Sequence, residues 1–535
     1  MKLWGFLRKE FDTPIIHVVI IASVAGLSNA LLLVFINSAA HEGPNVRLFL
    51  FFTVAILLYI FTQKYILSIS AVEVERVVER IRTRLADKIR KSDLLSLEHL
   101  GRSQVYASVN RETQTLSQAT APIIIACQGG IFLFFSLFYM FTLSRIAFVL
   151  TLIILGVAIF IHFGRHRELM AQLQRSMDRE NYFFEILTHL LDGFKEVKLN
   201  EKRSTDLFDH LRKIAESVAD SKTKTGAQFA SYYIFTQTTF YLLIATMVFI
   251  LPEWSEAYSE RVTEITATIL FIIGPVSGVV GAVPVFSNAN LAIQNIEQLE
   301  ETLDRVQREA EGREGGQRAD LSNFRRITFD HVLFHYKDKE GHPLFTIGPI
   351  DLQIDRGEII FIVGGNGCGK STFLKLLTGL YYPVSGRISV DDAELEGLYH
   401  GSYRDLFSAI FADYHLFDRL YGLADVEKGR VQELLKLMGL ENKTGLVDGR
   451  FENQELSTGQ MKRLALIVSL LEDKPIYVFD EWAAEQDSSF REFFYNELLK
   501  DLKARGKTII AASHDDRYFH VADRVLKMEY GQFVG

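Results

Sequence analysis

A glycine-rich segment in the second half of the chain has the composition of a phosphate-binding loop. The apolar run 359–363 leads into Gly364, Gly365, Asn366, Gly367, Cys368, Gly369, Lys370, Ser371 and Thr372. Glycines let backbone N–H groups curl around phosphates, and the start of the following helix favours their negative charge. We expect Lys370 to reach the β and γ phosphates of a bound nucleotide and Ser371 to ligate Mg²⁺.

Two adjacent acids follow a later apolar run, Ile476–Phe479. Asp480 stands where a strand would end, which suits a ligand of Mg²⁺ held directly or through water. Glu481 is then placed to polarise an attacking water. Two acids after a strand also begin many helices, where they favour the positive end of the helix dipole. The phosphate-binding loop elsewhere in the chain favours the chemical role.

Two further motifs point to the same site. His514 follows the apolar run Thr508–Ala512, and we expect it at a strand end facing the γ-phosphate, although a lone histidine there is often structural. The second motif consists of Ser457, Thr458, Gly459 and Gln460. It precedes an expected helix over 461–471, and it predicts either a second anion-binding helix start or a capped helix without a ligand. Nothing within one chain makes this motif meet the loop.

Short apolar runs alternate with helical stretches around these motifs. Strands are expected at 327–334, 359–363, 476–479 and 508–512, and helices such as 371–380 lie between some of them. This alternation is typical of an α/β domain with a largely parallel sheet. We therefore expect such a domain over 321–535.

The first half of the chain has the composition of a membrane domain. The 535 residues include 58 Lys and Arg against 66 Asp and Glu, a net charge of −8 that excludes a general nucleic-acid binder. The mean hydropathy is +0.11 because an apolar half is averaged with a polar one. Six apolar segments are about long enough to cross a bilayer as helices. They cover 14–40, 46–61, 121–141, 146–163, 229–251 and 265–286.

Basic residues are distributed unevenly among the connections between these segments. The N-terminal stretch and the connections after the second and fourth segments are rich in Lys and Arg. The other three connections carry only Arg47, Arg145 and Arg261. Because basic connections stay in the cytoplasm, we expect the N-terminus and both long connections there.

Both long connections have helical periodicity. Val74, Val77, Ile81 and Leu85 recur three or four residues apart, as on one face of a helix. We expect each spanning helix to continue as a cytoplasmic arm that turns near 97–102 or near 191–194. A separate domain inserted in each connection is the alternative. The membrane domain is expected over 1–309, with a polar linker at 310–320.

Several amide side chains lie within the apolar segments. They are Asn29, Asn37, Gln128, Gln237 and Asn288. Such groups usually hydrogen-bond to neighbouring helices. They can also line an aqueous cavity for a polar ligand, and both interpretations stay open.

The order of the motifs resembles that of ATP-binding cassette (ABC) ATPases, and six spans before one cassette resemble an ABC exporter half-transporter. The resemblance implies a membrane all-α six-helix domain fused to an α/β P-loop ABC ATPase domain, with ATP and Mg²⁺ as cofactors. Cassettes of that family pair head to tail, so Ser457–Gln460 would close on the nucleotide of a second copy, which implies a homodimer. Tyr336 matches the family's adenine-stacking aromatic, and Asp487 matches the loop that connects the two sites.

Two positions depart from the family pattern. Ala412 occupies the place of a glutamine that contacts Mg²⁺ and water, and the neighbouring Asp413 is a candidate to replace it. Trp482–Ala483 replaces the usual Pro-Thr after the catalytic glutamate.

Strings in both halves resemble the cyclic-peptide and siderophore-peptide (pyoverdine-type) exporters of bacteria. They begin at Leu191, Tyr403, Asp480 and Ser513. The resemblance implies export of a peptide-like or siderophore-like cargo across the bacterial inner membrane, with the ATPase domain in the cytoplasm. A lipid or multidrug exporter, a siderophore importer with the same fold, and a nucleotide-gated channel or signalling subunit remain alternatives.

Overall fold

The computed structural model describes residues 2–12, 14–43, 45–101, 105–164, 166–254, 261–314, 319–338, 341–391, 393–395, 400–423 and 425–534. The chain divides into two compact units. The N-terminal unit contains residues 1–90 and 100–303, and the C-terminal unit contains residues 91–99 and 304–535. Of the predicted linker at 310–320, residues 315–318 lie outside the described part, as does Arg102 at the first predicted arm turn.

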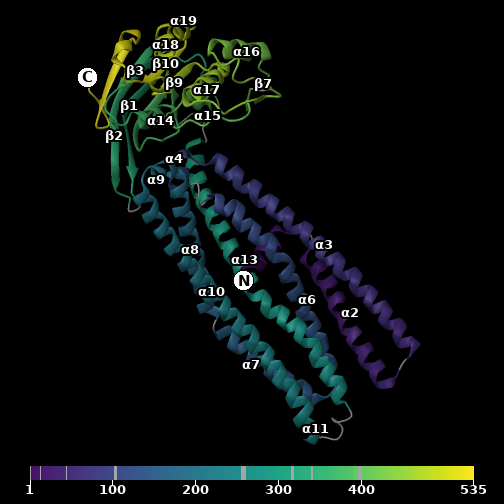
Figure 1. Cartoon of the computed structure of the whole chain (residues 1–535). Helices are drawn as coiled ribbons and strands as arrows, with labels where there is room; N and C mark the ends of the chain where they lie inside the picture. Colours follow the sequence, from purple (N-terminus) through teal and green to yellow (C-terminus); the bar gives the residue numbers. More distant parts are fainter. Residues whose placement is uncertain are drawn as a thin grey trace. The chain divides into compact units, whose positions relative to one another are not determined.

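The N-terminal unit is built from long helices (Figure 1). Its main helices are α1 (Lys2–Glu10), α2 (Ile15–Glu42), α3 (Val46–Lys91), α6 (Thr113–Leu143), α7 (Arg145–Gly164), α8 (His166–Asp192), α9 (Phe194–Leu199), α10 (Glu201–Ala245), α11 (Leu251–Trp254) and α13 (Val262–Glu314). In the described residues, 5 helices are long and apolar enough to cross a membrane. The predicted segment 146–163 falls in α7, whose described apolar part, Arg145–Val157, is shorter.

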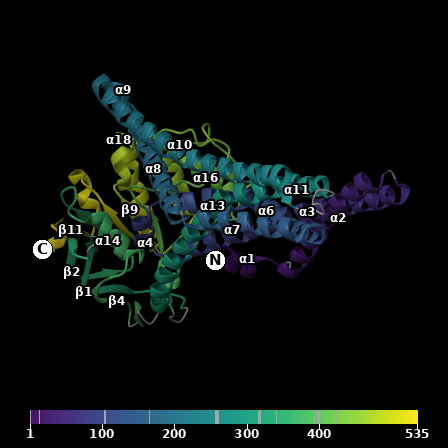
Figure 2. The same cartoon turned by 90° about the horizontal axis from the view of Figure 1, so that it is seen from below.

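The helices extend well beyond the apolar segments, as the periodicity predicts. Beyond its apolar part, α3 continues to Lys91 as an amphipathic helix, and Val77, Ile81 and Leu85 on its inner face are at most 2% exposed. These side chains pack against the apolar face of α13, formed by Ile293, Ile296, Leu299 and Leu303. In the second arm, α8 lies along α10 (Figure 2). The hydrophobic face therefore holds each helical arm against a neighbour.

The C-terminal unit contains two larger sheets. The six-stranded sheet has the order β12-β11-β3-β10-β9-β6, and its strands are parallel except for β12. A separate four-stranded sheet, β2-β1-β4-β5, is antiparallel. The predicted strand 327–334 is confirmed as part of β1, and it belongs to the antiparallel sheet. The apolar pattern identified the strand, but pairing depends on residues distant in the chain.

The bounds of these elements are as follows. The strands are β1 (Arg326–Lys337), β2 (Pro343–Asp355), β3 (Ile359–Val363), β4 (Ser385–Val390), β5 (Ala393–Glu394), β6 (Phe407–Ile410), β7 (Leu446–Val447), β8 (Arg450–Phe451), β9 (Ile476–Asp480), β10 (Thr508–Ala512), β11 (Arg524–Glu529) and β12 (Gln532–Val534). The helices are α14 (Lys370–Leu377), α15 (His400–Arg404), α16 (Lys428–Leu437), α17 (Thr458–Glu472), α18 (Ser488–Phe493) and α19 (Leu499–Ala504). Most of the short helix α4 (Leu94–Leu100) also belongs to this unit.

Strand β3 lies between two hydrophobic cores. Ile360 and Ile362 face the core shared with the antiparallel sheet and α14. Ile359 and Phe361 face the core shared with α16 and α17. A strand covered on both faces is apolar at every position, which is why this segment reads as a continuous apolar run.

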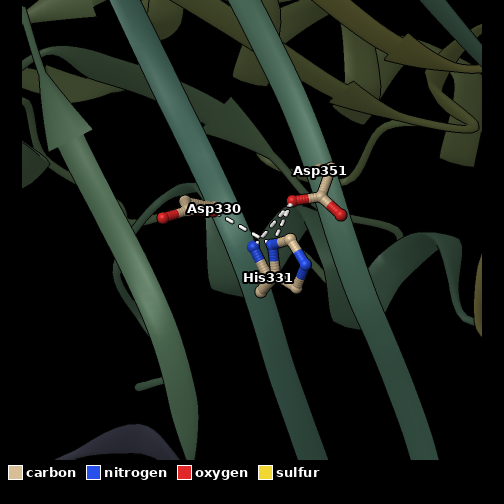
Figure 3. A group of neighbouring side chains, drawn as sticks. All are labelled: Asp330, His331 and Asp351. Carbon is tan, nitrogen blue, oxygen red and sulfur yellow. Dashed lines mark hydrogen bonds and ion pairs between the residues drawn. The ribbon is translucent and has the colours of Figure 1, made fainter.

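A bulge in β1 is stabilised by a small polar cluster of Asp330, His331 and Asp351 (Figure 3). The pairing of β1 with β2 shifts register between Phe329 and Val332, and His331 has a φ of 51°. Its Nδ1 lies 3.0 Å from a carboxylate oxygen of Asp330 and 2.9 Å from one of Asp351. These contacts raise the pKa of His331, the hydrogen bond to Asp330 contributing most. The cluster is exposed and stabilises the irregular backbone at this point.

Candidate nucleotide-hydrolysis site

The glycine-rich loop joins β3 to α14 and curls around the Lys370 side chain. Gly364 has a φ of 156°, and a Cβ there would overlap the Met528 carbonyl, so this position requires glycine. Lys370 is 5% exposed, and its Nζ donates to the carbonyls of Gly364 at 3.0 Å and Gly365 at 3.2 Å. The ammonium group is therefore held inside the loop, where a phosphate-binding role requires it.

Three neighbouring parallel strands bring the candidate catalytic groups together. Strand β10 lies between β3 and β9, and Ala512 is in register with both Ile362 and Asp480. The residues that follow these strands therefore meet at one edge of the sheet. An Oε1 of Glu481 lies 3.5 Å from Nζ of Lys370 and 3.0 Å from Nε2 of His514. The structure thus places Glu481 in contact with both of the other predicted side chains, Lys370 and His514.

Asp480 is buried at the end of β9, and only 2% of the residue is exposed. Burial raises the pKa of Asp480, and a hydrogen bond with Ser371 partly opposes this shift. One of its carboxylate oxygens, Oδ1, has no hydrogen-bond partner among the described residues. A buried carboxylate with a free oxygen beside a hydroxyl is a donor set that fits Mg²⁺. Asp480 and Ser371 would hold the ion, which would neutralise charge on the phosphates.

The backbone at Glu481 adopts a conformation that side chains rarely take, with a φ of 51°. Strain of this kind persists only where surrounding contacts hold it. The Glu481 N–H donates to the Ala512 carbonyl at 3.2 Å. The next residue, Trp482, is 1% exposed, and its indole N–H donates to the Lys462 carbonyl at 3.0 Å. Its ring lies 4.5 Å from that of Phe494, so Trp482 anchors the turn that aims Glu481.

The position of the missing glutamine is close to Asp480. The backbone N–H of Ala412 hydrogen-bonds to the Asp480 carboxylate. Asp413 is exposed, and in the described part of the chain its side chain forms no hydrogen bond or ion pair. The structure therefore assigns Ala412 a backbone contact, and the replacement of glutamine by Asp413 stays a prediction.

Tyr336 lies at the centre of a hydrogen-bonded network beside α14. Its hydroxyl is 3.2 Å from the Thr372 hydroxyl and 3.3 Å from that of Tyr381. The Tyr381 hydroxyl donates to Glu98 of α4 at 2.6 Å, and the second Glu98 oxygen accepts from Nζ of Lys375 at 3.0 Å. Burial and the contact with Glu98 raise the pKa of Tyr381.

This network connects α4 to the glycine-rich loop. Leu94 and Leu95 of α4 pack against the same hydrophobic core as α14. The sequence reasoning missed Tyr381 and Glu98, because no local pattern relates a tyrosine after α14 to a glutamate on a distant arm.

The signature residues form a capped helix start. The Ser457 side chain accepts from the Gln460 N–H, and the Gln460 side chain accepts from the Ser457 N–H. The Gly459 carbonyl accepts from the side chain of Gln486 at 3.1 Å. In the described ranges no hydrogen bond or ion pair joins 457–460 to 364–372. The structure brings the other predicted groups together but leaves this motif apart from them.

Asp487 is tied into its own cassette. Its side chain accepts from the Phe490 N–H at 2.9 Å and from the Ser489 hydroxyl at 2.7 Å, and it pairs with Arg463. These bonds lower the pKa of Asp487 to about 2, the backbone bond from Phe490 contributing most. Asp487 therefore caps α18 and fixes the loop beside the signature residues.

Known proteins resemble both halves of the chain. The family profile described as ABC transporter matches residues 347–484. ATP-binding protein SyrD of Pseudomonas syringae pv. syringae is 34% identical over 96% of this chain and 92% of its own length. Subtilin transport ATP-binding protein SpaT of Bacillus subtilis is 23% identical over 84% of this chain and 75% of its own length.

The fold also matches a solved structure over nearly its whole length. A bacterial Atm1-family ABC exporter with ATP bound superposes with a TM-score of 0.76 at 18% identity. The match covers 97% of this chain and 93% of that one. Together with the geometry of the cassette, these similarities establish what kind of protein this is. The chain belongs to the ABC transporter family, as an exporter half-transporter that couples ATP hydrolysis to transport.

Proposed function

We propose that this chain works as a homodimer that exports a peptide-type cargo, cyclic or siderophore-related, across the bacterial inner membrane. The observation that carries the cargo class is the resemblance of strings in both halves to cyclic-peptide and siderophore-peptide exporters. The 34% identity to SyrD over 96% of the chain supports a shared overall plan. Subtilin transport, the activity in the name of SpaT, is a second indication of the cargo class.

The proposed roles at the ATP site follow from the contacts. Lys370 and the backbone of 364–369 bind the phosphates, Tyr336 stacks on adenine, and Asp480 with Ser371 holds Mg²⁺. Glu481 polarises the attacking water, and His514 keeps the Glu481 carboxylate in place through their 3.0 Å contact. An oriented carboxylate acting on a bound water is a common form of general base.

The separation of the signature from the loop supports the homodimer. Ser457 and Thr458 are exposed, and their helix start is able to bind an anion. A second copy placed head to tail would bring these residues to the nucleotide of the first. ATP would then draw two cassettes together, and hydrolysis would release them.

The test uses the full-length protein reconstituted in lipid vesicles. A neutral cyclic peptide should stimulate ATP hydrolysis and, in inside-out vesicles, should accumulate in the lumen when ATP is added. Stimulation by lipid alone would favour a lipid exporter. ATP-driven loss of peptide from the lumen would indicate import.

A further inference from the structure

The structure separates the amides within the apolar segments into two groups. Asn37 is 3% exposed, and its side-chain nitrogen lies 3.1 Å from the Glu264 carbonyl and 3.2 Å from the Thr268 hydroxyl. Gln237 donates to the Tyr233 hydroxyl one turn earlier on its own helix. Asn29, Gln128 and Asn288, by contrast, form no side-chain hydrogen bond with any described residue, and neither does Gln63, just beyond the second segment. The first group serves packing, whereas the second requires another explanation.

Asn29, Gln63 and Gln128 line one pocket, whereas Asn288 lies outside its lining. The pocket has a volume of about 210 Å³ and lies among α2, α3, α6 and α13 of the N-terminal unit. Asn29 contributes from α2, Tyr59 and Gln63 from α3, and Gln128 from α6. Gln128 is 8% exposed, and its amide nitrogen has no partner within the described ranges. Leaving a buried amide without a hydrogen bond is unfavourable.

Small residues keep the pocket open between closely packed helices. Gly26 lies against Ile131, so that a Cβ there would be 2.7 Å from an Ile131 methyl carbon. A Cβ added to Gly129 would likewise lie 3.1 Å from the carbonyl oxygen of Pro275. These contacts bring α2, α6 and α13 together around the pocket. On the α13 wall, Gly274 and Gly278 have nothing within 4 Å of an added Cβ, so the lining is not filled by side chains.

The position of the pocket along the helices suits the uptake of cargo. Asn29 and Gln63 are about 20–25 Å from the turn between α2 and α3, counting 1.5 Å per residue. In the proposed orientation this turn faces outward, and the hydrocarbon core is about 30 Å thick. The pocket therefore lies in the half of the membrane nearest the cytoplasm.

The chemistry of the lining selects a class of ligand. Among the residues that the structure describes, its polar side chains are carboxamides and a phenol, and no Lys, Arg, Asp or Glu lines it. Carboxamides offer both donors and acceptors, which complement the N–H and C=O groups of a peptide backbone. An anionic lipid headgroup would lack a cation to pair with.

We propose that Asn29, Gln63 and Gln128 form a subsite that hydrogen-bonds neutral amide groups of the cargo. This inference rests on the proposed function and adds the groups that recognise the cargo. Binding would supply the partners that the buried amide of Gln128 lacks. Entry from the cytoplasmic side would place the cargo there before the spans rearrange.

The experiment compares leucine substitutions in the reconstituted full-length protein. Gln128→Leu and Asn29→Leu keep the approximate size of the side chain and remove its hydrogen bonds. We expect each to raise about tenfold the concentration of a neutral, backbone-cyclised peptide that half-stimulates ATP hydrolysis. Gln237→Leu is the matched control, because Gln237 lies within a span but outside the pocket, and it should behave as the unmodified protein.

The outcomes separate this inference from the proposed function. If the peptide stimulates Gln128→Leu and Asn29→Leu at the same concentration as the unmodified protein, the subsite is wrong while the cargo class stands. If the peptide stimulates neither the variants nor the unmodified protein, the cargo class itself is wrong, and the inference fails with it. Gln128→Asn keeps an amide and should give an intermediate value if Gln128→Leu does not fold.

Discussion

The hydroxyl of Tyr381 donates a 2.6 Å hydrogen bond to the carboxylate of Glu98, although 283 positions separate them in the chain. Because the same hydroxyl lies 3.3 Å from that of Tyr336, α4 is linked to the residue expected to stack on adenine. The bond lies within the C-terminal unit, whereas the chain before α4 continues directly into the spanning helix α3. Tyr381 therefore contacts both α4 and a residue that we expect to bind ATP.

Replacing Tyr381 with Phe should loosen α4. A hydrogen bond to a charged group contributes about 1–2 kcal/mol after partial exposure is considered, so the amides of 94–99 should exchange with deuterium about tenfold faster. Hydrogen-exchange mass spectrometry of the full-length protein measures this. Tyr421→Phe is the control, since the Tyr421 side chain is exposed. Equal exchange in both variants would show that the bond does not hold α4.

Glu481→Gln should bind ATP but lose nearly all turnover. The amide keeps the shape of the side chain yet cannot accept the proton of the attacking water, and a general base commonly contributes about 10²–10⁴-fold to rate. Phosphate release reports turnover, and the ATP-dependent rise in the unfolding temperature reports binding. Glu485→Gln is the control from the same turn. Substantial phosphate release by Glu481→Gln would remove Glu481 from the role of base.

Trp482→Ala should damage both stability and catalysis. Removing a buried aromatic side chain costs about 3–5 kcal/mol, and the turn that holds Glu481 at a φ of 51° would lose its anchor. We expect a lower unfolding temperature together with slower ATP hydrolysis. Trp482→Phe keeps a ring but loses the N–H bond to the Lys462 carbonyl. Its unfolding temperature and its rate of ATP hydrolysis should lie between those of Trp482→Ala and the unmodified protein. Normal hydrolysis by folded Trp482→Ala would show that the anchor is unnecessary.

The Asp487 ion pair and cap should make stability depend on pH in the acid range. The pKa of Asp487 is lowered from 3.8 to about 2. Its contribution is therefore fully present above a pH near the ordinary value and is lost as the pH falls through about 2. Asp487→Asn retains a capping oxygen but not the charge. The difference in unfolding temperature between this variant and the unmodified protein should shrink as the pH falls from about 4 to about 2, and a constant difference would contradict the assignment.

The ATP site could be predicted largely from the sequence, because its parts are local. The strand 359–363 and the loop after it are specified by a continuous apolar run and adjacent glycines. The ends of β3, β9 and β10 then meet because parallel strands in one sheet share an edge. Lys370, Glu481 and His514 are brought together by this geometry alone.

Other features depend on contacts that no local pattern encodes. The antiparallel sheet results from pairing of β1 with both β2 and β4, and the sequence indicated only that 327–334 is a strand. The pocket also depends on contacts between distant residues, since Asn29, Gln63 and Gln128 come from three helices. Their amide character was visible in the sequence, whereas their convergence required the packing of α2, α3 and α6.

The burial of Cys368 inside the glycine-rich loop has a practical consequence for labelling. Its residue is 8% exposed, its carbonyl accepts from the Gly531 N–H at 2.9 Å, and the other cysteine, Cys127, is exposed. Cys127 lies within the predicted spanning segment 121–141, where the bilayer covers it, and a maleimide dye should reach Cys368 only when the loop opens. The chain thus carries a slow reporter of loop opening at Cys368, without any engineered thiol.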